Sequence, residues 1–499
     1  MAETLNQRIE RERKEARPSL TDWSDVRLYR EYARGRQRKT LNADQIRIMA
    51  GVIKSPFSDN ILKKIITEHA TRLRLARFDV EDKGVSSFLY DLWIRNQLPD
   101  LFADAIYAVL RDGNHAISLN WQPSDSPNDP DGGRVVLNRE RWWDGKDGVF
   151  VKYDDSGQPE YAVKEWKSSD GVARRNIYFP EAFYRFQFRD GAWEPFILEG
   201  DEELFAIDTE TGRPVPGLIP WLKLDGSPLG IPIVHLPNGS DDDTYYGASI
   251  LDGGTLGFQD QINAIQHDIT AAAMMNGSVQ TWSKGFSLPI DNEGNPVRIK
   301  TGPGTHHHTD ETTAEWGVIP AGSLTELKNA YMTKVEAVCR NTNTPIHTIT
   351  GQWPSGEAIF RAEMPIVGDT LKLAESIGPQ MSTVAHRATE IYNAFGIGPE
   401  LNEDSLIRTI FEPAEQRDPI TIWTVAEKSA PFVSNQEVLR SVGKTPEEIK
   451  MIMDERADEK TESISMAQAA FSRPPDMEAL LRAGGQAVDV SNVETEGNE

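Results

Sequence analysis

The chain has 499 residues, which is enough for roughly two to four domains with a sizeable core. Its formal net charge of −24 argues against a general nucleic-acid binder, because such proteins present basic surface to phosphate, but it leaves open a channel through which DNA slides without sticking. The single cysteine, Cys339, excludes a disulfide framework and indicates a reducing compartment. We expect neither a secretory signal nor a membrane-spanning helix, because no long apolar run is present.

The first 54 residues are richer in arginine and lysine than the acidic remainder of the chain. Basic residues between Arg8 and Arg17 alternate with glutamates in a predicted helix, which is typical of a solvated helix with internal ion pairs. The alternative is an arm that contacts a neighbouring subunit or DNA. Neither this cluster nor the second one, at 34–39, alternates with aromatic residues as a single-strand binder would.

The part of the chain after this arm is predicted to be mainly helical, with one strand. Apolar positions recur at helical spacing over 60–77, 85–99 and 100–110, and the run 116–121 favours a strand. The acidic loop 124–133 lacks the spacing and the closing glutamate of a calcium loop, so no metal site is expected there.

Residues 134–236 alternate short strand-like runs with turns, which is typical of an antiparallel meander. A further strand at 231–238 leads into a long helix predicted over 255–276, and a second amphipathic helix is predicted over 324–341. Two long helices therefore bracket a compact insertion. That arrangement suits a stalk carrying a head better than it suits a catalytic pocket.

The insertion between the two helices, 279–320, is predicted to contain short strands at 288–290, 296–300 and 316–319. The consecutive histidines His306, His307 and His308 suggest a metal site. Adjacent histidines cannot all face one ion in a regular strand, so an exposed loop is the preferred interpretation. In a ring each histidine would recur in every copy, and a pH-sensitive annulus remains as an alternative.

The segment Thr344–Ser355 has no helical pattern and is longer than a tight turn requires. It is either a loop that projects from the molecule or a buried connection with Trp353 in the core. Ser355 is a good amino-terminal cap for the long helix that follows. Pro365 and Pro379 predict a kink or break in that helix.

The carboxy-terminal part is predicted to return one strand and then form helices. The strand at 406–411 is expected to rejoin the earlier sheet, and helices are expected at 419–428, 435–442 and 446–470. Residues after about 472 lack a long apolar pattern and are expected to form a flexible tail.

Five stretches occur in a characteristic order and spacing over roughly residues 55–370. They are SDNILKKIITEHATRLRLARF at 58–78, LWIRNQLPDLFADAIYAVLRDGNHAISLNW at 92–121, YAVKEWKSSDGVARRNIYFPEAFYRF at 161–186, GIPIVHLPNGSDDDTYYGASILDGGTLGFQDQINA at 230–264 and TPIHTITGQWPSGEAIFRAEMPIV at 344–367. Together they resemble the portal proteins of tailed bacteriophages. The amino-terminal arm and everything beyond about residue 400 lie outside the resemblance.

The resemblance implies a virion protein that assembles in the host cytoplasm into a ring, usually a dodecamer, at one vertex of the capsid. Double-stranded DNA would pass through its channel during packaging and ejection, driven by a separate terminase motor. The implied partners are terminase, head–tail adaptor, major capsid and scaffolding proteins, with no membrane, no cofactor and no enzymatic activity of its own.

The implied fold is α+β: an α/β wing, a two-helix stem, a small β-containing clip and a helical carboxy-terminal crown. The expected divisions are an arm at 1–54, wing at 55–252, stem helix at 253–278, clip at 279–320, stem helix at 321–343, tunnel loop at 344–356, kinked wing helix and return strand at 357–414, crown at 415–471 and tail at 472–499.

The resemblance also assigns candidate functional residues. The tunnel loop would meet DNA through neutral side chains that grip phosphate weakly, namely Ile346, Ile349, Thr350, Gln352 and Trp353. In the stem, Lys328 and Lys334 would line the channel or pair with Glu326, Glu336 or a neighbour's Asp260. In the clip, terminase or adaptor docking is expected at Arg298, Lys300, His306, His307 and His308.

Enzyme classes find little support in the sequence. It contains no Walker A, G-x-S-x-G, H-E-x-x-H or C-x-x-C motif. Asp241, Asp242 and Asp243 resemble a two-metal carboxylate cluster, but consecutive acids in a loop point in different directions. The alternatives to a portal are therefore another ring-forming head–tail connector component and, with less support, a carboxylate-metal hydrolase.

Overall fold

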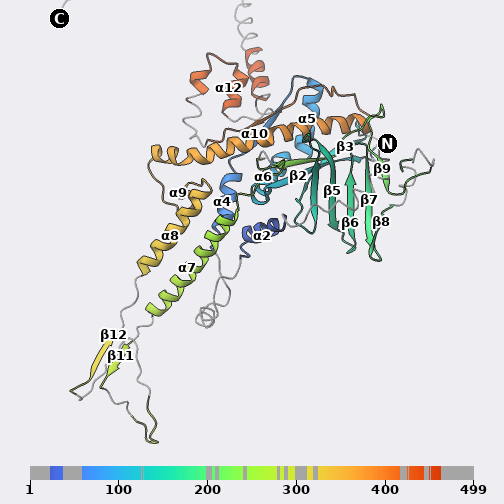
Figure 1. The fold of residues 1–499 in the computed structure, drawn as a ribbon. Helices are drawn as coiled ribbons and strands as arrows, with labels where there is room; N and C mark the ends of the chain where they lie inside the picture. The colour runs from blue at the N-terminus through green and yellow to red at the C-terminus, as the bar shows by residue number, and fades with distance from the viewer. Residues whose placement is uncertain are drawn as a thin grey trace, which may run out of the picture. The chain divides into compact units, whose positions relative to one another are not determined.

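Helices and antiparallel strands both make up large parts of this chain, so it is an α+β protein (Figure 1). The computed structural model describes residues 23–37, 59–124, 126, 129–197, 205–207, 213–239, 244–277, 281–285, 290–297, 312–318, 324–415, 424, 426–442, 449 and 451–461. The chain divides into two units, Met1–Glu415 and Gln416–Glu499.

The first unit begins with helices that pack against one another. They are α2 (Ser24–Ala33), α4 (Ile61–Ala70), α5 (Lys83–Arg95) and α6 (Leu98–Asp112). Asn60 caps α4, because its side chain accepts a hydrogen bond from the Lys63 amide at 3.2 Å. Asp82 caps α5 in the same way through the Val85 amide at 2.9 Å.

The prediction that the helix beginning near residue 60 continues to Arg77 is wrong. The helix ends at Ala70, and Leu75–Asp79 forms strand β1, which pairs antiparallel with β13 (Arg408–Phe411). The strand predicted at 406–411 is therefore confirmed in kind, but it joins a separate two-stranded sheet rather than the meander. Pairing with a segment more than 300 residues away overrides the local helical pattern.

The two larger sheets are antiparallel throughout, which confirms the predicted meander. One has the order β10–β2–β3, formed by Ile233–Pro237, Asn114–Pro123 and Gly133–Glu140. The six-stranded sheet runs β4–β5–β6–β7–β8, with β9 also paired to β7. Its strands are Gly148–Tyr153, Pro159–Lys167, Ala173–Tyr178, Ala182–Arg189, Ala192–Pro195 and Leu218–Pro220.

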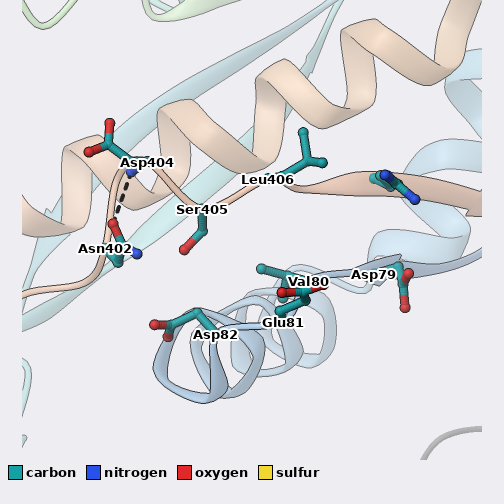
Figure 2. A pocket seen from close by; sticks show the side chains of 9 residues that line it. Asp79, Val80, Glu81, Asp82, Asn402, Asp404, Ser405 and Leu406 are labelled. Atoms are coloured by element: carbon teal, nitrogen blue, oxygen red, sulfur yellow. Dashed lines mark hydrogen bonds between the residues drawn. The ribbon is translucent and has the colours of Figure 1, made fainter.

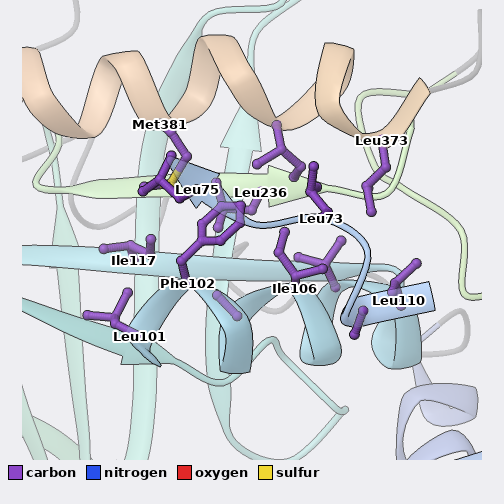
Figure 3. Packing of buried hydrophobic residues seen from close by; sticks show 14 of the residues in the cluster. Leu73, Leu75, Leu101, Phe102, Ile106, Leu110, Ile117, Leu236, Leu373 and Met381 are labelled. Carbon is purple, nitrogen blue, oxygen red and sulfur yellow. The ribbon is translucent and has the colours of Figure 1, made fainter. Parts of the chain in front are cut away.

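The main core lies where α6 and the long helix α10 (Gly356–Phe395) meet strands β2 and β10 (Figure 3). Phe102 and Ile106 from α6, Ile117 from β2 and Met381 from α10 are all almost completely buried. The six-stranded sheet has its own smaller cluster, which includes Ile177 and Phe179.

Helix α10 is continuous over 40 residues and passes through both Pro365 and Pro379. Of the two predicted outcomes, a kink or a break, the break is therefore wrong at both positions. An interior proline removes one backbone hydrogen bond and costs on the order of 3 kcal/mol. Burial of an apolar stripe offsets this cost, and the stripe includes Ile366, Ile377, Met381, Val384 and Ile391.

The second unit is helical where it is described. Helix α12 spans Asn435–Ser441, which confirms the helix predicted at 435–442. Residues 426–429 and 451–461 are also helical, and they overlap the helices predicted at 419–428 and 446–470. The predicted tail, 472–499, lies outside the described residues.

A pair of buried histidines lies on adjacent strands of the three-stranded sheet. His235 stacks on Trp142 with ring centroids 4.4 Å apart, and its ring nitrogens contact Tyr153 Oη and Asn114 Oδ1, both at 2.8 Å. Both ring nitrogens of His115 lack a hydrogen-bond partner among the described residues. Burial lowers the pKa of His115 to about 4, against the opposing effect of nearby Asp112, and burial also lowers the pKa of His235 to about 3.

These histidines predict acid sensitivity. The unfolded chain binds protons near pH 6.5 whereas the folded chain does not, so stability is fully present above that pH and is lost as pH falls toward 4 and 3. We expect each histidine to lower the free energy of unfolding by about 2 kcal/mol between pH 7 and pH 5. Urea unfolding at both pH values measures this loss.

His115→Leu supplies the matched variant. It removes the histidine whose ring nitrogens have no hydrogen-bond partner among the described residues. The loss of stability between pH 7 and pH 5 should therefore shrink by about 2 kcal/mol, while stability at pH 7 is kept or raised. An unchanged pH dependence in this variant would show that His115 is not the group that titrates.

Candidate functional site

The region of interest begins with two helices that pack side by side, α7 (Gly253–Gly277) and α8 (Leu324–Asn341) (Figure 1). Helix α8 has the bounds of the amphipathic helix predicted at 324–341, and α7 begins at the first residue of the predicted stem helix, 253–278. Asp252 caps α7, because its carboxylate accepts a hydrogen bond from the Thr255 amide at 2.7 Å. The end of α7 near the core is thus defined by a local cap.

A buried polar seam joins α7 to the chain just before α4. Gln259 is fully buried and donates through Nε2 to the Asp59 carbonyl at 2.6 Å, and Asn263 accepts from the Asp59 amide at 3.2 Å. Tyr331 of α8 donates to the Asp59 carboxylate. Residue 59 therefore bonds to both helices, and the seam helps to set the position of the pair against the core.

The two lysines predicted to line a channel lie in different environments. Lys328 is exposed, whereas Lys334 is half-buried with its ammonium group 5.8 Å from the centre of the Phe258 ring on α7. Asp260, the proposed partner from a neighbour, accepts hydrogen bonds from Tyr32 Oη of its own chain at 2.8 and 2.9 Å. Lys334 therefore contributes to packing within the helix pair.

The ends of α7 and α8 away from the core lead to a two-stranded sheet. Strand β11 (Thr281–Lys284) pairs antiparallel with β12 (Glu315–Val318). This confirms the strand predicted near 316–319, and it pairs within the chain. A side chain at Gly317 would clash with the Trp282 indole, so glycine allows the indole to lie across the opposite strand.

The other residues assigned to this insertion are not all described. A single bridge joins Ile290 and Pro296, within the stretch where two further strands were predicted. The residues proposed for docking, Arg298, Lys300, His306, His307 and His308, lie outside the described residues.

The segment predicted to be a loop without helix contains a short helix, α9 (Ile346–Thr350), so that part of the prediction is wrong. Pro345 precedes α9, and Gly351 ends it with a φ of 73°, a conformation that glycine adopts without strain. Only residues 351–355 form an irregular stretch before α10. The five-residue length of α9 explains why its pattern escaped detection, since one turn shows no periodicity.

The five candidate residues in this segment divide into two groups. Ile346 and Ile349 are half-buried and pack against the main core, and Thr350 donates to the Ile346 carbonyl at 3.1 Å. Gln352 and Trp353 are exposed, and the Trp353 side chain is 65% exposed. The alternative that placed Trp353 in the core is therefore wrong.

A chain of buried polar side chains lies beneath α9. His347 is 2% exposed, lies 3.6 Å from a Glu363 carboxylate oxygen and has its ring centre 4.9 Å from that of Trp353. Glu363 also faces the buried guanidinium of Arg72 at 3.4 Å, and Arg72 pairs with Glu68 at 3.1 Å. The exposed indole is thereby connected to α4 and α10 through contacts that the sequence analysis did not identify.

A second set of contacts holds the turn before α9. His69 Nε2 lies 3.1 Å from Thr344 Oγ1, which in turn lies 2.8 Å from Thr342 Oγ1. Asn343, whose φ is 51°, donates to the Asp369 carboxylate at 2.8 Å. Burial lowers the pKa of His69, so the neutral ring is favoured at this position.

Substitutions of half-buried and of exposed residues in this segment should lower the free energy of unfolding by different amounts. Ile349→Ala should lower the free energy of unfolding by about 1 to 2 kcal/mol, because it removes half-buried apolar surface from the core. Trp353→Ala should change it by less than about 1 kcal/mol, because most of the indole is in solvent. Urea unfolding of both variants tests this, and an equal cost would contradict the division.

The described residues show neither a metal-ligand cluster nor a membrane-spanning helix. They contain no group of three or more His, Cys, Asp or Glu side chains placed to hold a metal ion, and Asp241, Asp242 and Asp243 lie outside them. Within these same parts of the chain, no helix combines the length and the apolar character needed to cross a membrane. The sequence matches no protein-family model and no curated protein.

Proposed function

We propose that this chain is a portal protein of a tailed bacteriophage. Copies of it would form a ring, expected to be a dodecamer, whose channel carries double-stranded DNA into and out of the capsid. In this proposal the elements from α4 to β10, together with α10 and β13, are the wing. Helices α7 and α8 are the stem, and β11–β12 belongs to the clip. The second unit would supply the crown.

The observation that carries the proposal is the order of elements from α7 to α10. Two long helices pack together, bracket a small two-stranded sheet and are followed by a short segment and a 40-residue helix. A helix of 25 residues extends about 37 Å at 1.5 Å per residue, which is long enough to form the wall of a channel. The resemblance to portal proteins implies this same order of stem helix, clip, stem helix and long wing helix.

The exposed side chains after α9 suit contact with DNA that has to move. Gln352 and Trp353 carry no charge, so they attract phosphate weakly and allow sliding. The exposed indole packs against His347, whose ring is in turn held by buried contacts with Glu363 and, through it, Arg72. In the ring, these side chains would form a neutral constriction, and terminase, adaptor, capsid and scaffolding proteins would bind elsewhere on its surface.

Electron microscopy of the purified full-length protein, together with its mass in solution, tests the proposal. We expect rings with a central opening at least as wide as a DNA duplex, with α7 and α8 lining it. Rings whose opening is too narrow for duplex DNA would contradict a portal. A folded chain that stays monomeric both alone and with its capsid partners would contradict ring assembly altogether.

A variant separates the DNA-contacting role from assembly. Trp353→Ala should form the same rings, because the indole is exposed, but should change the amount of DNA packaged with a purified terminase. Leu371→Ala is the matched control, since Leu371 is also an exposed apolar residue, on α10, and lies outside the proposed constriction.

A further inference from the structure

The carboxylates of the polar pocket between the turn from β1 to α5 and the chain from α10 to β13 do not converge on one point (Figure 2). The pocket has a volume of about 520 Å³, and its lining includes Glu81, Asp82, Asp404 and Ser405. Figure 2 shows the Asp404 carboxylate directed away from the wall that carries Glu81 and Asp82. We therefore assign no ligand to this pocket.

The ionisable side chains beneath α9 do converge, and they are almost completely removed from solvent. The guanidinium of Arg72 lies 3.1 Å from the Glu68 carboxylate and 3.4 Å from that of Glu363. His347 completes the group, because its Nε2 lies 3.6 Å from a Glu363 oxygen. All four side chains are at most 14% exposed, so water does little to screen the charges from one another.

The charge of this group depends on the protonation of His347. One guanidinium faces two carboxylates, so the group has an excess negative charge while the imidazole is neutral. Burial of a charge without compensation is costly. A proton on His347 would balance the group. The imidazole takes this proton before a carboxyl group does, because unperturbed histidine and glutamate have pKa values of about 6.5 and about 4.3.

The other charged groups that the structure describes around α9 do not supply this compensation. Lys64 lies 4.0 Å from Glu68, but its side chain is 54% exposed, so water and salt screen its charge. Burial lowers the pKa of His69, which favours the neutral ring. On α10, Asp369 would add negative charge, and Arg340 at the end of α8 is exposed.

We propose that His347 is a positioning residue for the exposed indole of Trp353, and that it acts as the imidazolium. Its Nε2 has no hydrogen-bond partner among the described residues. In the charged ring this nitrogen carries a proton and is attracted to the Glu363 carboxylate. The imidazole and indole ring centres are 4.9 Å apart, within the about 6 Å over which an indole attracts a cation. Protonation therefore strengthens both contacts of the ring.

The consequence is that the indole of Trp353 is held more firmly as the pH falls. Histidine is the side chain whose charge ordinarily changes near neutral pH, so a small change in pH alters the contact. The contact lies within one chain and does not depend on ring assembly. Its relevance to DNA rests on the proposed function, since the neutral side chains of the constriction would become less mobile where the duplex slides past them.

Tryptophan fluorescence of the full-length protein tests this assignment. Subtraction of the emission of Trp353→Phe from that of the unaltered protein isolates the signal of this indole. We expect the difference emission to fall at least twofold between pH 9 and pH 5.5, because an imidazolium in contact with an excited indole quenches it. Quenching of the same signal by acrylamide should also become weaker at the lower pH, because the indole is held more firmly.

Variants of the protein assign the pH dependence to this group. His347→Gln should abolish the pH dependence of the Trp353 emission. Glu363→Gln should weaken proton binding about tenfold or more, which lowers the midpoint of the change by at least one pH unit or so, because the carboxylate no longer attracts the charged ring. His386→Gln is the matched control, since His386 is a half-buried histidine of α10 outside this group, and it should leave the curve unchanged. Circular dichroism at each pH confirms that every variant is folded.

Three results would overturn the proposal. One is a Trp353 emission that stays the same from pH 9 to pH 5.5. Another is a pH dependence that persists in His347→Gln, and the third is an unchanged midpoint in Glu363→Gln. Ring formation is measured separately by electron microscopy. A protein that forms no rings would still show this titration, and a protein that forms rings could lack it, so the two proposals fail independently.

Discussion

Replacement of Gly113 by alanine is expected to lower the free energy of unfolding by about 3 kcal/mol. Gly113 ends α6 with a φ of 83°, a conformation that costs alanine about 1 to 2 kcal/mol. The added Cβ would also meet three backbone atoms of residues 247–249, the closest being the Gly247 oxygen at 2.7 Å. Overpacking of this kind costs a further 1 to 3 kcal/mol or so, because backbone cannot turn aside as a side chain can.

Gly226→Ala is the matched control for this substitution. Gly226 has nearly the same φ, 84°, but a Cβ there would have no neighbour within 4 Å. We expect a cost of about 1 kcal/mol, which isolates the conformational part of the effect. Urea unfolding at one fixed protein concentration, followed by tryptophan fluorescence, compares the two. Equal losses would show that the contact with residues 247–249 contributes nothing.

The contact matters beyond stability, because residues 247–249 lead directly into α7. Asn238 donates its amide to the Gly113 carbonyl at 2.8 Å, and Asn114 forms two bonds with the Gly247 backbone, at 2.8 and 2.9 Å. A shift at Gly113 would therefore move the start of α7. In the proposed ring this is the junction of wing and stem, so Gly113→Ala should also reduce the yield of rings.

Arg30→Met is expected to lower the free energy of unfolding by about 3 kcal/mol. The buried guanidinium bonds to Asp112 at 2.9 Å, to Asp144 at 2.9 Å and to the Trp142 carbonyl at 2.8 Å. Removing one partner of a buried ion pair typically costs 3 to 5 kcal/mol or so, because a charge is left uncompensated. The lower figure applies here because Arg111 and Arg141 still pair with these aspartates.

Arg361→Met is the corresponding surface control. Arg361 pairs with Glu357 at 2.7 Å, but both side chains are at least 75% exposed. Such pairs contribute between about 0 and 1 kcal/mol, so little change is expected. Unfolding in urea measures both variants. If Arg30→Met cost no more than Arg361→Met, the buried network would not be what attaches α2 to the sheet.

Local sequence patterns were sufficient to predict the elements whose partners are near in the chain. The spacing of Leu327, Tyr331, Val335 and Val338 predicted a helix over 324–341, and α8 has those bounds. Alternating strands and turns predicted the meander in the same way, because each strand pairs with its neighbour in sequence. The same patterns missed the short helix after α8, and it was the resemblance to portal proteins that made that segment a candidate site.

Tertiary structure decided the features that depend on distant parts of the chain. Leu75–Asp79 becomes a strand because β13 pairs with it, and α10 continues through Pro365 and Pro379 because a buried stripe stabilises it. Likewise, the contacts of Arg72, Glu363 and His347 join the turn after α4 to α10 and α9, and the pocket beside Ser405 forms between two segments more than 300 residues apart. A local pattern depends only on the spacing of residues within one segment. These arrangements depend on which faces of distant helices and strands are buried together.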